Sequence, residues 1–214
     1  MRITHLGHAC LLVETAGTRL LLDPGVFSAG FEDLTGLDAV LITHQHPDHV
    51  DPARLGPLLE RNPGAAVHAE AQTAEQLAGQ GLTAAAVRPG EVLELGGARV
   101  EAVGGEHAVI HDDIPRVGNV GLLVRAPGEP VLLHPGDSYG TAPEGVDVLA
   151  VPLNAPWAAL KETVDFVRAV GARVAVPVHD SLLQPHGRGM YVRHVGNLGG
   201  AEVRDLAETG PGEF

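Results

Sequence analysis

The segment Thr43-His44-Gln45-His46-Pro47-Asp48-His49 brings four potential metal ligands into six consecutive positions. Imidazole nitrogens and carboxylate oxygens are the usual ligands of zinc and of related divalent ions. Gathering so many titratable groups in one turn is costly unless a metal ion compensates them. A solvated polar turn would also accept these residues, so the prediction of a metal site depends on finding further ligands downstream. The four residues are His44, His46, Asp48 and His49.

The apolar run 39–42, directly before this segment, predicts a buried strand. Pro47 and Pro52 prevent that strand from continuing. The potential ligands therefore lie on a turn at the end of a rigid strand, where catalytic groups are often found.

Three further potential ligands share a position just after an apolar strand. They are His107 after residues 98–103, Asp137 after residues 131–133, and His179 after residues 174–178. Four strand ends can converge on one point in a sandwich, whatever their separation in the sequence. The sequence therefore predicts a binuclear metal site.

With these elements the chain resembles the metallo-β-lactamase-fold hydrolase superfamily. The matching segments are Leu22-Asp23-Pro24, residues 43–49, His107, Gly136-Asp137 and Pro177-Val178-His179. The opening His5-Leu6-Gly7-His8-Ala9 resembles the branch that includes L-ascorbate-6-phosphate lactonase. The resemblance implies a four-layer αββα sandwich of the α+β class, formed by residues 1–214 as one domain.

The resemblance also implies how the ligands are divided between two ions. His44, His46 and His107 would hold the first ion, Asp48, His49 and His179 the second, and Asp137 would bridge them. His111, four residues after His107, is the alternative third ligand of the first ion. If His107 is that ligand, His111 and Arg116 lie near the mouth of the cleft or on a solvated loop.

Other polar residues are expected to support the site or to bind substrate. Asp23 resembles an aspartate that supports the metal site, and its alternative role is a turn before Pro24. His8 lies near the cleft or packs at a strand edge, and His134 orients Asp137 or caps its strand. Side chains that could line a substrate pocket are Asn154, Trp157, His186, Arg188 and Tyr191, although the helical spacing of Trp157 favours core packing.

The expected chemistry is hydrolysis by a hydroxide shared between two divalent ions and oriented by Asp48. The ligand types favour zinc, with manganese as the alternative. The substrate would be a small-molecule ester, lactone or phosphoester. A phosphodiesterase or ribonuclease on the same fold, and a metal-binding module without turnover, are the alternative functions.

Composition also limits the expected partners and the expected compartment of the protein. The net charge of −13 argues against a nucleic-acid partner, which normally meets a basic surface. No apolar run is long enough to predict a membrane span, and the first residues lack the pattern of a signal peptide. Cys10 is the only cysteine, so no internal disulfide forms, and the cytoplasm is the expected compartment. A homo-oligomer is left open.

The expected elements alternate between strand-rich blocks and helices. Strands are predicted at 2–6, 10–14, 19–22, 39–42, 66–69, 91–95, 98–103, 120–125, 130–134, 147–151, 173–178 and 202–205. Helices are predicted at 51–60, 71–78, 157–170 and 189–198, and the tail 209–214 is expected to be frayed.

Overall fold

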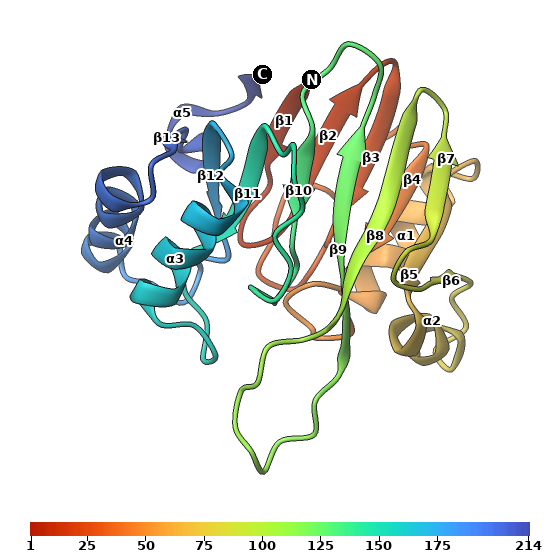
Figure 1. The fold of residues 1–214 in the computed structure, drawn as a ribbon. Coiled ribbons are helices and arrows are strands. Elements are labelled where there is room, and N and C mark those ends of the chain that lie inside the picture. Colours follow the sequence, from red (N-terminus) through yellow and green to blue (C-terminus); the bar gives the residue numbers. More distant parts are fainter.

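Two seven-stranded sheets face each other in the structure, a computed structural model that describes residues 1–214 (Figure 1). The first sheet has the order β14 (Gly212–Glu213), β1 (Arg2–His5), β2 (Leu11–Thr15), β3 (Thr18–Leu22), β4 (Ala39–Ile42), β5 (Ala66–Glu70) and β6 (Ala85–Val87). The second has the order β13 (Glu202–Val203), β12 (Val174–Val178), β11 (Val148–Pro152), β10 (Leu132–His134), β9 (Gly118–Arg125), β8 (Ala98–Glu106) and β7 (Val92–Leu95).

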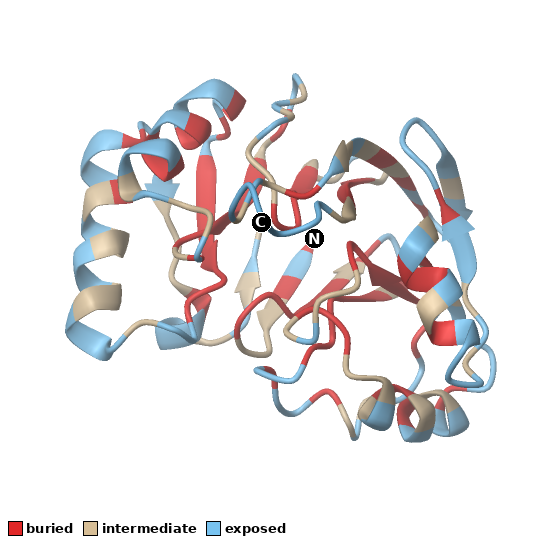
Figure 2. Ribbon diagram, turned by 90° about the horizontal axis from the view of Figure 1, so that it is seen from below, coloured by how far each residue is buried: buried red, intermediate tan, exposed pale blue.

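Helices cover the outer face of each sheet. α1 (Pro52–Arg61) and α2 (Ala71–Ala78) pack on the first sheet, and α3 (Leu160–Val170) and α4 (Pro185–Leu198) pack on the second. Figure 2 shows these helices with exposed residues outward and buried residues toward the sheets. The short α5 (Leu206–Thr209) contributes Leu206 to the core between the sheets. None of the helices is both long and apolar enough to cross a membrane.

The alternation of side chains along the strands builds three apolar layers. In β3, Leu20 and Leu22 face the other sheet, whereas Leu21 packs toward the helices. In β9, Leu122 faces inward and Leu123 outward, toward α3 and α4. Because successive side chains of a strand point to opposite faces, strands with apolar residues at every position must be covered on both sides. The predicted αββα sandwich is confirmed.

Local signals predicted several elements well. The Asp51 side chain accepts hydrogen bonds from the amides of Ala53 and Arg54, at 3.0 and 3.3 Å, and so begins α1 as an N-cap. The Gly96-Gly97 turn joins β7 to β8, with Leu95 paired to Ala98.

Other boundaries were wrong. Helix α3 begins at Leu160, so Trp157 lies in the loop before it and not on its buried face. Helix α4 begins at Pro185, which suits the first helical position because it lacks an amide hydrogen. Strand β8 runs through its two glycines to Glu106, since Gly104 and Gly105 pair with β9. β6 and α5 were not predicted.

The C-terminal tail is not frayed, contrary to the expectation from its glycines and proline. Gly212 pairs with Ile3 of β1, and the Phe214 amide donates to the Met1 carbonyl over 2.9 Å. Main-chain hydrogen bonds need no particular side chain, so composition alone does not reveal this pairing.

Candidate metal centre

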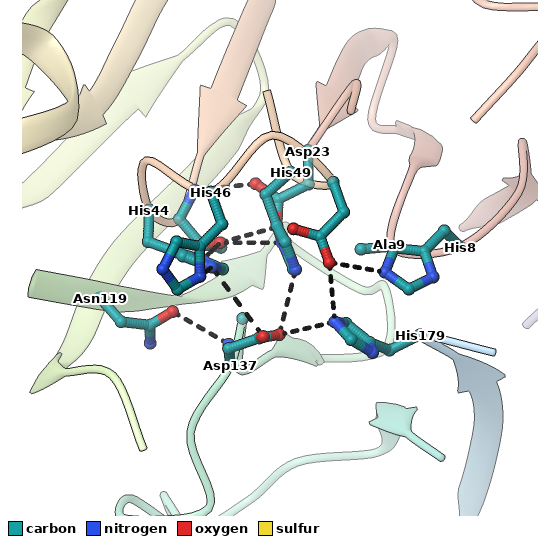
Figure 3. Close-up of polar contacts among 12 residues, drawn as sticks. His8, Ala9, Asp23, His44, His46, His49, Asn119, Asp137 and His179 are labelled. Atoms are coloured by element: carbon teal, nitrogen blue, oxygen red, sulfur yellow. Dashed lines mark hydrogen bonds and ion pairs between the residues drawn. The ribbon is translucent and has the colours of Figure 1, made fainter. Parts of the chain in front are cut away.

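The seven predicted ligands come together where several strands of the two sheets end. Figure 3 shows His44, His46, His49, Asp137 and His179 among them. His44 lies just after β4, and His179 directly follows β12. His107 directly follows β8, and Asp137 comes three residues after β10. Their potential ligand atoms fall into two groups, and within each group all atoms lie within 4.8 Å of one another. The groups are His44, His46, His107 and Asp137, and His8, Asp48, His49 and His179.

The first group has spacings close to those of a tetrahedral zinc site. His44 Nε2 lies 3.1 Å from His46 Nδ1, and His107 Nε2 lies 3.3 Å from Asp137 Oδ2. His44 Nε2 lies 3.9 Å from the same carboxylate oxygen. Bonds of about 2.0 Å to a tetrahedral ion place neighbouring ligand atoms about 3.3 Å apart. Three histidines and one carboxylate therefore surround a space of the right size for one ion.

The second group is joined by the other oxygen of the same aspartate. Asp137 Oδ1 lies 3.0 Å from His49 Nε2 and 3.3 Å from His179 Nε2. His179 Nε2 also lies 3.5 Å from Asp48 Oδ2. Since Asp137 turns Oδ2 to the first group and Oδ1 to the second, its carboxylate lies between the two groups.

Hydrogen bonds determine which ring nitrogen four of the histidines offer to the centre. The Nδ1–H of His107 donates to the Ala108 carbonyl over 2.6 Å, and that of His179 to the Asn154 carbonyl over 2.7 Å. Nδ1–H of His49 donates to Asp23 Oδ2 over 2.7 Å, and Nδ1 of His44 lies 3.0 Å from the Thr43 hydroxyl. In a neutral imidazole, a protonated Nδ1 leaves the lone pair on Nε2. All four rings thus present Nε2 to the centre.

Several of these inward atoms are buried without a hydrogen-bond partner. They are Nε2 of His49, His107 and His179, and Oδ1 of Asp137. Unpaired buried polar atoms are rare because each loses its hydration without compensation. Four such atoms directed at one small region fit the donor set of divalent cations.

Asp23 and Thr43 form a network beneath the histidines. Asp23 Oδ1 accepts from the Thr43 amide over 2.8 Å, and Oδ2 accepts from the Thr43 hydroxyl over 2.7 Å as well as from His49. Asp23 has a left-handed φ of 46°, a strained conformation that the network holds in place. Asp23 therefore orients His49 and does more than form a turn before Pro24.

His8 faces Asp48 with a defined tautomer. The Ser181 amide donates to His8 Nδ1 over 3.3 Å, so Nδ1 carries the lone pair. Nε2–H then donates to Asp48 Oδ2 over 3.1 Å. Burial lowers the pKa of His8, which favours the neutral ring. His8 is therefore buried within the second group, whereas sequence analysis left packing at a strand edge as an alternative.

The other residues that sequence analysis proposed for the site do not all lie at the metal centre. His111 is 65% exposed and belongs to neither group, whereas His107 is buried in the first. Arg116 donates to the His107 carbonyl and to Glu106. His134 donates from Nε2 to the Ala9 carbonyl over 2.8 Å and accepts from the Gly136 amide, which supports the turn before Asp137. His186 is exposed on α4 and lies outside both groups.

Sequence analysis missed Asn119 and misjudged Trp157. Asn119 Oδ1 accepts from the Asp137 amide, and its Nδ2 donates to the Pro135 carbonyl, both over 3.0 Å. Trp157 Nε1–H donates to Asp137 Oδ2 over 2.9 Å, so its indole belongs to the site. An asparagine next to the apolar run 120–124 was the available signal, because buried polar side chains need partners.

Electrostatics in the metal-free protein favour protons where ions would bind. Burial opposes a charge on His179, but Asp137 and Asp48 outweigh it and raise the pKa of His179 to about 9. Burial likewise opposes a charge on His49, yet Asp137 and Asp23 hold the pKa of His49 well above its usual value. Burial and the neighbouring His49 instead lower the pKa of His44. Protons on His49 and His179 thus partly offset the carboxylates until a cation replaces them.

Comparison with known proteins agrees with this geometry. Residues 2–179 match the family model of the beta-lactamase superfamily domain. Protein Rv0786c of Mycobacterium tuberculosis is 48% identical over 209 residues, which cover 97% of both chains. A UPF0173 protein of Pyrococcus furiosus is 34% identical over 187 residues, covering 84% of this chain and 83% of its own. A UPF0173 metal-dependent hydrolase of Azorhizobium caulinodans is 35% identical over 150 residues, 64% of each chain.

Solved structures share the fold at low sequence identity. Igni18, a metallo hydrolase from Ignicoccus hospitalis, superposes with a TM-score of 0.74 at 22% identity, covering 100% of this chain and 98% of its own. An isothiocyanate hydrolase from Delia radicum gut bacteria superposes with a TM-score of 0.76 at 16% identity, covering 100% and 99%. The sequence matches and the paired groups of ligands lead to one conclusion: the chain belongs to the beta-lactamase superfamily and, within it, to the UPF0173 family of metal-dependent hydrolases.

Proposed function

We propose that this protein binds two divalent ions and hydrolyses a small-molecule ester, lactone or phosphoester. The observation that carries the proposal is the orientation of Asp137, whose two oxygens face two separate groups of histidines. His44, His46 and His107 would hold the first ion, and Asp48, His49 and His179 the second, with Asp137 shared. Because ligands come from both sheets, residues 1–214 would act as one catalytic unit.

When bound, the ions would supply a water of lowered pKa and positive charge for the developing oxyanion. The chain's own contribution begins with Asp48, whose side chain is 22% exposed while most of its neighbours in the centre are fully buried. With Oδ2 held by His8, Asp48 Oδ1 is the atom we expect to accept a hydrogen bond from the attacking water. Asp23 would keep His49 in its orientation through the reaction.

His8 would act as a positioning residue and not as a ligand. Its Nδ1 accepts from the Ser181 amide, so its Nε2 carries a proton and has no lone pair for an ion. A protonated Nε2 can instead hold the Asp48 carboxylate at a fixed angle. Hydrogen bonds of this kind commonly determine the orientation of ligands around a metal ion.

The ligand set favours zinc, with manganese as the alternative. The five histidines among the proposed ligands suit zinc, which accepts nitrogen and carboxylate ligands at tetrahedral sites. Asp48 and the shared Asp137 add oxygen ligands on the second side, and oxygen ligands suit manganese. A lactone remains among the proposed substrates because the opening residues resemble the lactonase branch.

The decisive experiment combines metal content with turnover. Protein purified without chelator is analysed by mass spectrometry and assayed with an aryl ester, a lactone and a phosphodiester. We expect about two ions per chain, one for each group, and turnover of at least one substrate. Asp48→Asn should abolish turnover, while Asp33→Asn, at an exposed carboxylate, should not. A single ion that persists after zinc or manganese is added would contradict the binuclear centre. Two ions without any turnover would favour the binding module.

A further inference from the structure

A pocket of about 470 Å³ opens directly beside the metal centre. Ala108 and Ser138, which line it, are the chain neighbours of His107 and Asp137. Its other walls come from the loop after β8, the loop before α3, and α3 itself. A substrate whose reacting bond lies at Asp137 would therefore extend its next group into this pocket.

The Trp157 side chain contacts both the pocket and the metal centre. Its Nε1–H donates to Asp137 Oδ2, while its ring lines the pocket. The ring centroid lies 6.1 Å from that of His107 and 6.4 Å from that of His179. Tyr139 packs edge-on against the indole, with the ring centroids 4.8 Å apart, and Phe166 stacks on Tyr139. This cluster makes the inner wall of the pocket aromatic, a surface that favours flat apolar groups.

The outer wall carries two carboxylates, of which Glu162 makes no ion pair and Asp165 makes only a long, exposed one, with Arg168 Nη1 4.0 Å from Asp165 Oδ1. Glu162 and Asp165 lie one turn apart on α3, and both line the pocket and are exposed. Glu162 accepts from the Ala159 amide over 3.0 Å, which holds its carboxylate at the start of the helix. The one cation of the lining, Arg116, is already paired with Glu106 over 2.8 Å. An anionic group would therefore meet two carboxylates and an arginine that is already engaged.

Building on the proposed function, we propose that this pocket takes an aromatic or branched apolar group of an uncharged or cationic substrate and disfavours anionic ones. The aromatic group would lie against Trp157, and a positively charged or hydrogen-bond-donating end would face Glu162 and Asp165. Among the candidate substrates, those whose group next to the reacting bond is aromatic and uncharged or cationic fit this pocket, whereas those that carry an anionic group there do not.

Three matched probes test the charge preference. They are methyl esters of phenylpropionic acid that carry a methyl, an aminomethyl or a carboxyl group in the para position. Trp157 is the only tryptophan in the chain, so its fluorescence reports binding even in metal-free protein without turnover. We expect the aminomethyl probe to bind at least as tightly as the methyl probe, and the carboxyl probe about tenfold more weakly. The metal-loaded enzyme should show the same order in kcat/KM.

Substitutions then test the assignment to α3. The double variant Glu162→Gln, Asp165→Asn keeps a helix-capping group at 162 and should reduce the discrimination against the carboxyl probe to about threefold or less. Glu75→Gln, at an exposed position on α2, should leave the order unchanged. Tight binding of the carboxyl probe, or an order that survives the double variant, would overturn the inference.

The outcome separates this inference from the proposed function. If the probes bind in the expected order but no substrate is turned over, the pocket assignment stands and hydrolysis fails. If esters are turned over with a preference for the carboxyl probe, hydrolysis stands and the pocket assignment fails.

Discussion

His8 Nε2 lies 3.1 Å from Asp48 Oδ2, and the Ser181 amide makes the other ring nitrogen of His8 an acceptor. A histidine from the turn after β1 therefore aligns a carboxylate from the turn after β4. Both residues are far apart in the sequence, and neither contact depends on a metal ion. The pair gives a direct test of how the protein positions Asp48.

Replacing His8 should reduce catalysis without removing an ion. His8→Phe deletes the hydrogen bond to Asp48, and kcat/KM should fall about 10–100-fold, as for other outer hydrogen bonds at metal sites. His8→Gln keeps an N–H in a similar place and should recover part of the activity. Both variants accept the same left-handed backbone at φ 51°, so strain affects them alike. Loss of one ion from His8→Phe, by mass spectrometry, would instead make His8 a ligand.

Removing the indole hydrogen bond should weaken metal binding. Trp157→Phe keeps an aromatic wall but loses the hydrogen bond to Asp137 Oδ2, so we expect about a tenfold lower affinity in competition with a chelator. Tyr139→Phe is the control, because its hydroxyl contacts the Pro152 carbonyl and Thr163 and not the ligands. That control should lower stability and leave metal affinity unchanged. Equal affinity in Trp157→Phe would show that the indole only packs.

Metal affinity should increase as the pH rises from 7 to about 9. In the metal-free protein, carboxylates outweigh burial and raise the pKa of His179 to about 9, and that of His49 is also raised. An ion must displace these protons, so proton release should accompany loading in this range. Calorimetric titration in buffers of different ionisation enthalpy measures that release. A constant affinity across the range would contradict the protonated state of both rings.

The same shifts predict how the stability of the metal-free protein depends on pH. A raised folded-state pKa contributes stability below the unfolded value of about 6.5, and that contribution is lost as the pH rises through the folded value. The free energy of unfolding of chelator-treated protein should therefore fall between pH 7 and 9.5. The pKa of His44 is lowered, so this ring is neutral throughout the window and does not interfere. Urea titrations measure the trend, and a rise would refute it.

Gly136 should be irreplaceable at the turn before Asp137. It has a left-handed φ of 61°, and an added Cβ would lie 2.2 Å from Asn119 Oδ1 and 2.8 Å from Thr43 Cβ. Gly136→Ala should cost about 3 kcal/mol or more in urea unfolding. Gly128→Ala, with φ 76° and open space around it, should cost only about 1–2 kcal/mol for the backbone alone. Similar losses at both positions would show that the crowding at Gly136 relaxes.

Much of the centre follows from local patterns in the sequence. Residues 43–49 combine ligand types with a strand that must end, and this local pattern identified four potential ligands. His107, Asp137 and His179 follow apolar strands, and the same rule located them. Apolar runs in strands such as β3 and β9 also required cover on both faces, which led to the layered fold.

What the sequence by itself determined was therefore the local chemistry: the ligand types, the strands that end beside them and the helices that cover the sheets. Only the tertiary structure decided which groups meet. In the structure His107 lies in the first group and His111 does not. The two oxygens of Asp137 face different groups, and Asp137 also receives the Trp157 indole at its carboxylate and Asn119 at its amide. The tertiary structure also paired the tail with β1. Such contacts depend on the distance and direction between segments far apart in the chain, which residue types and spacing do not specify.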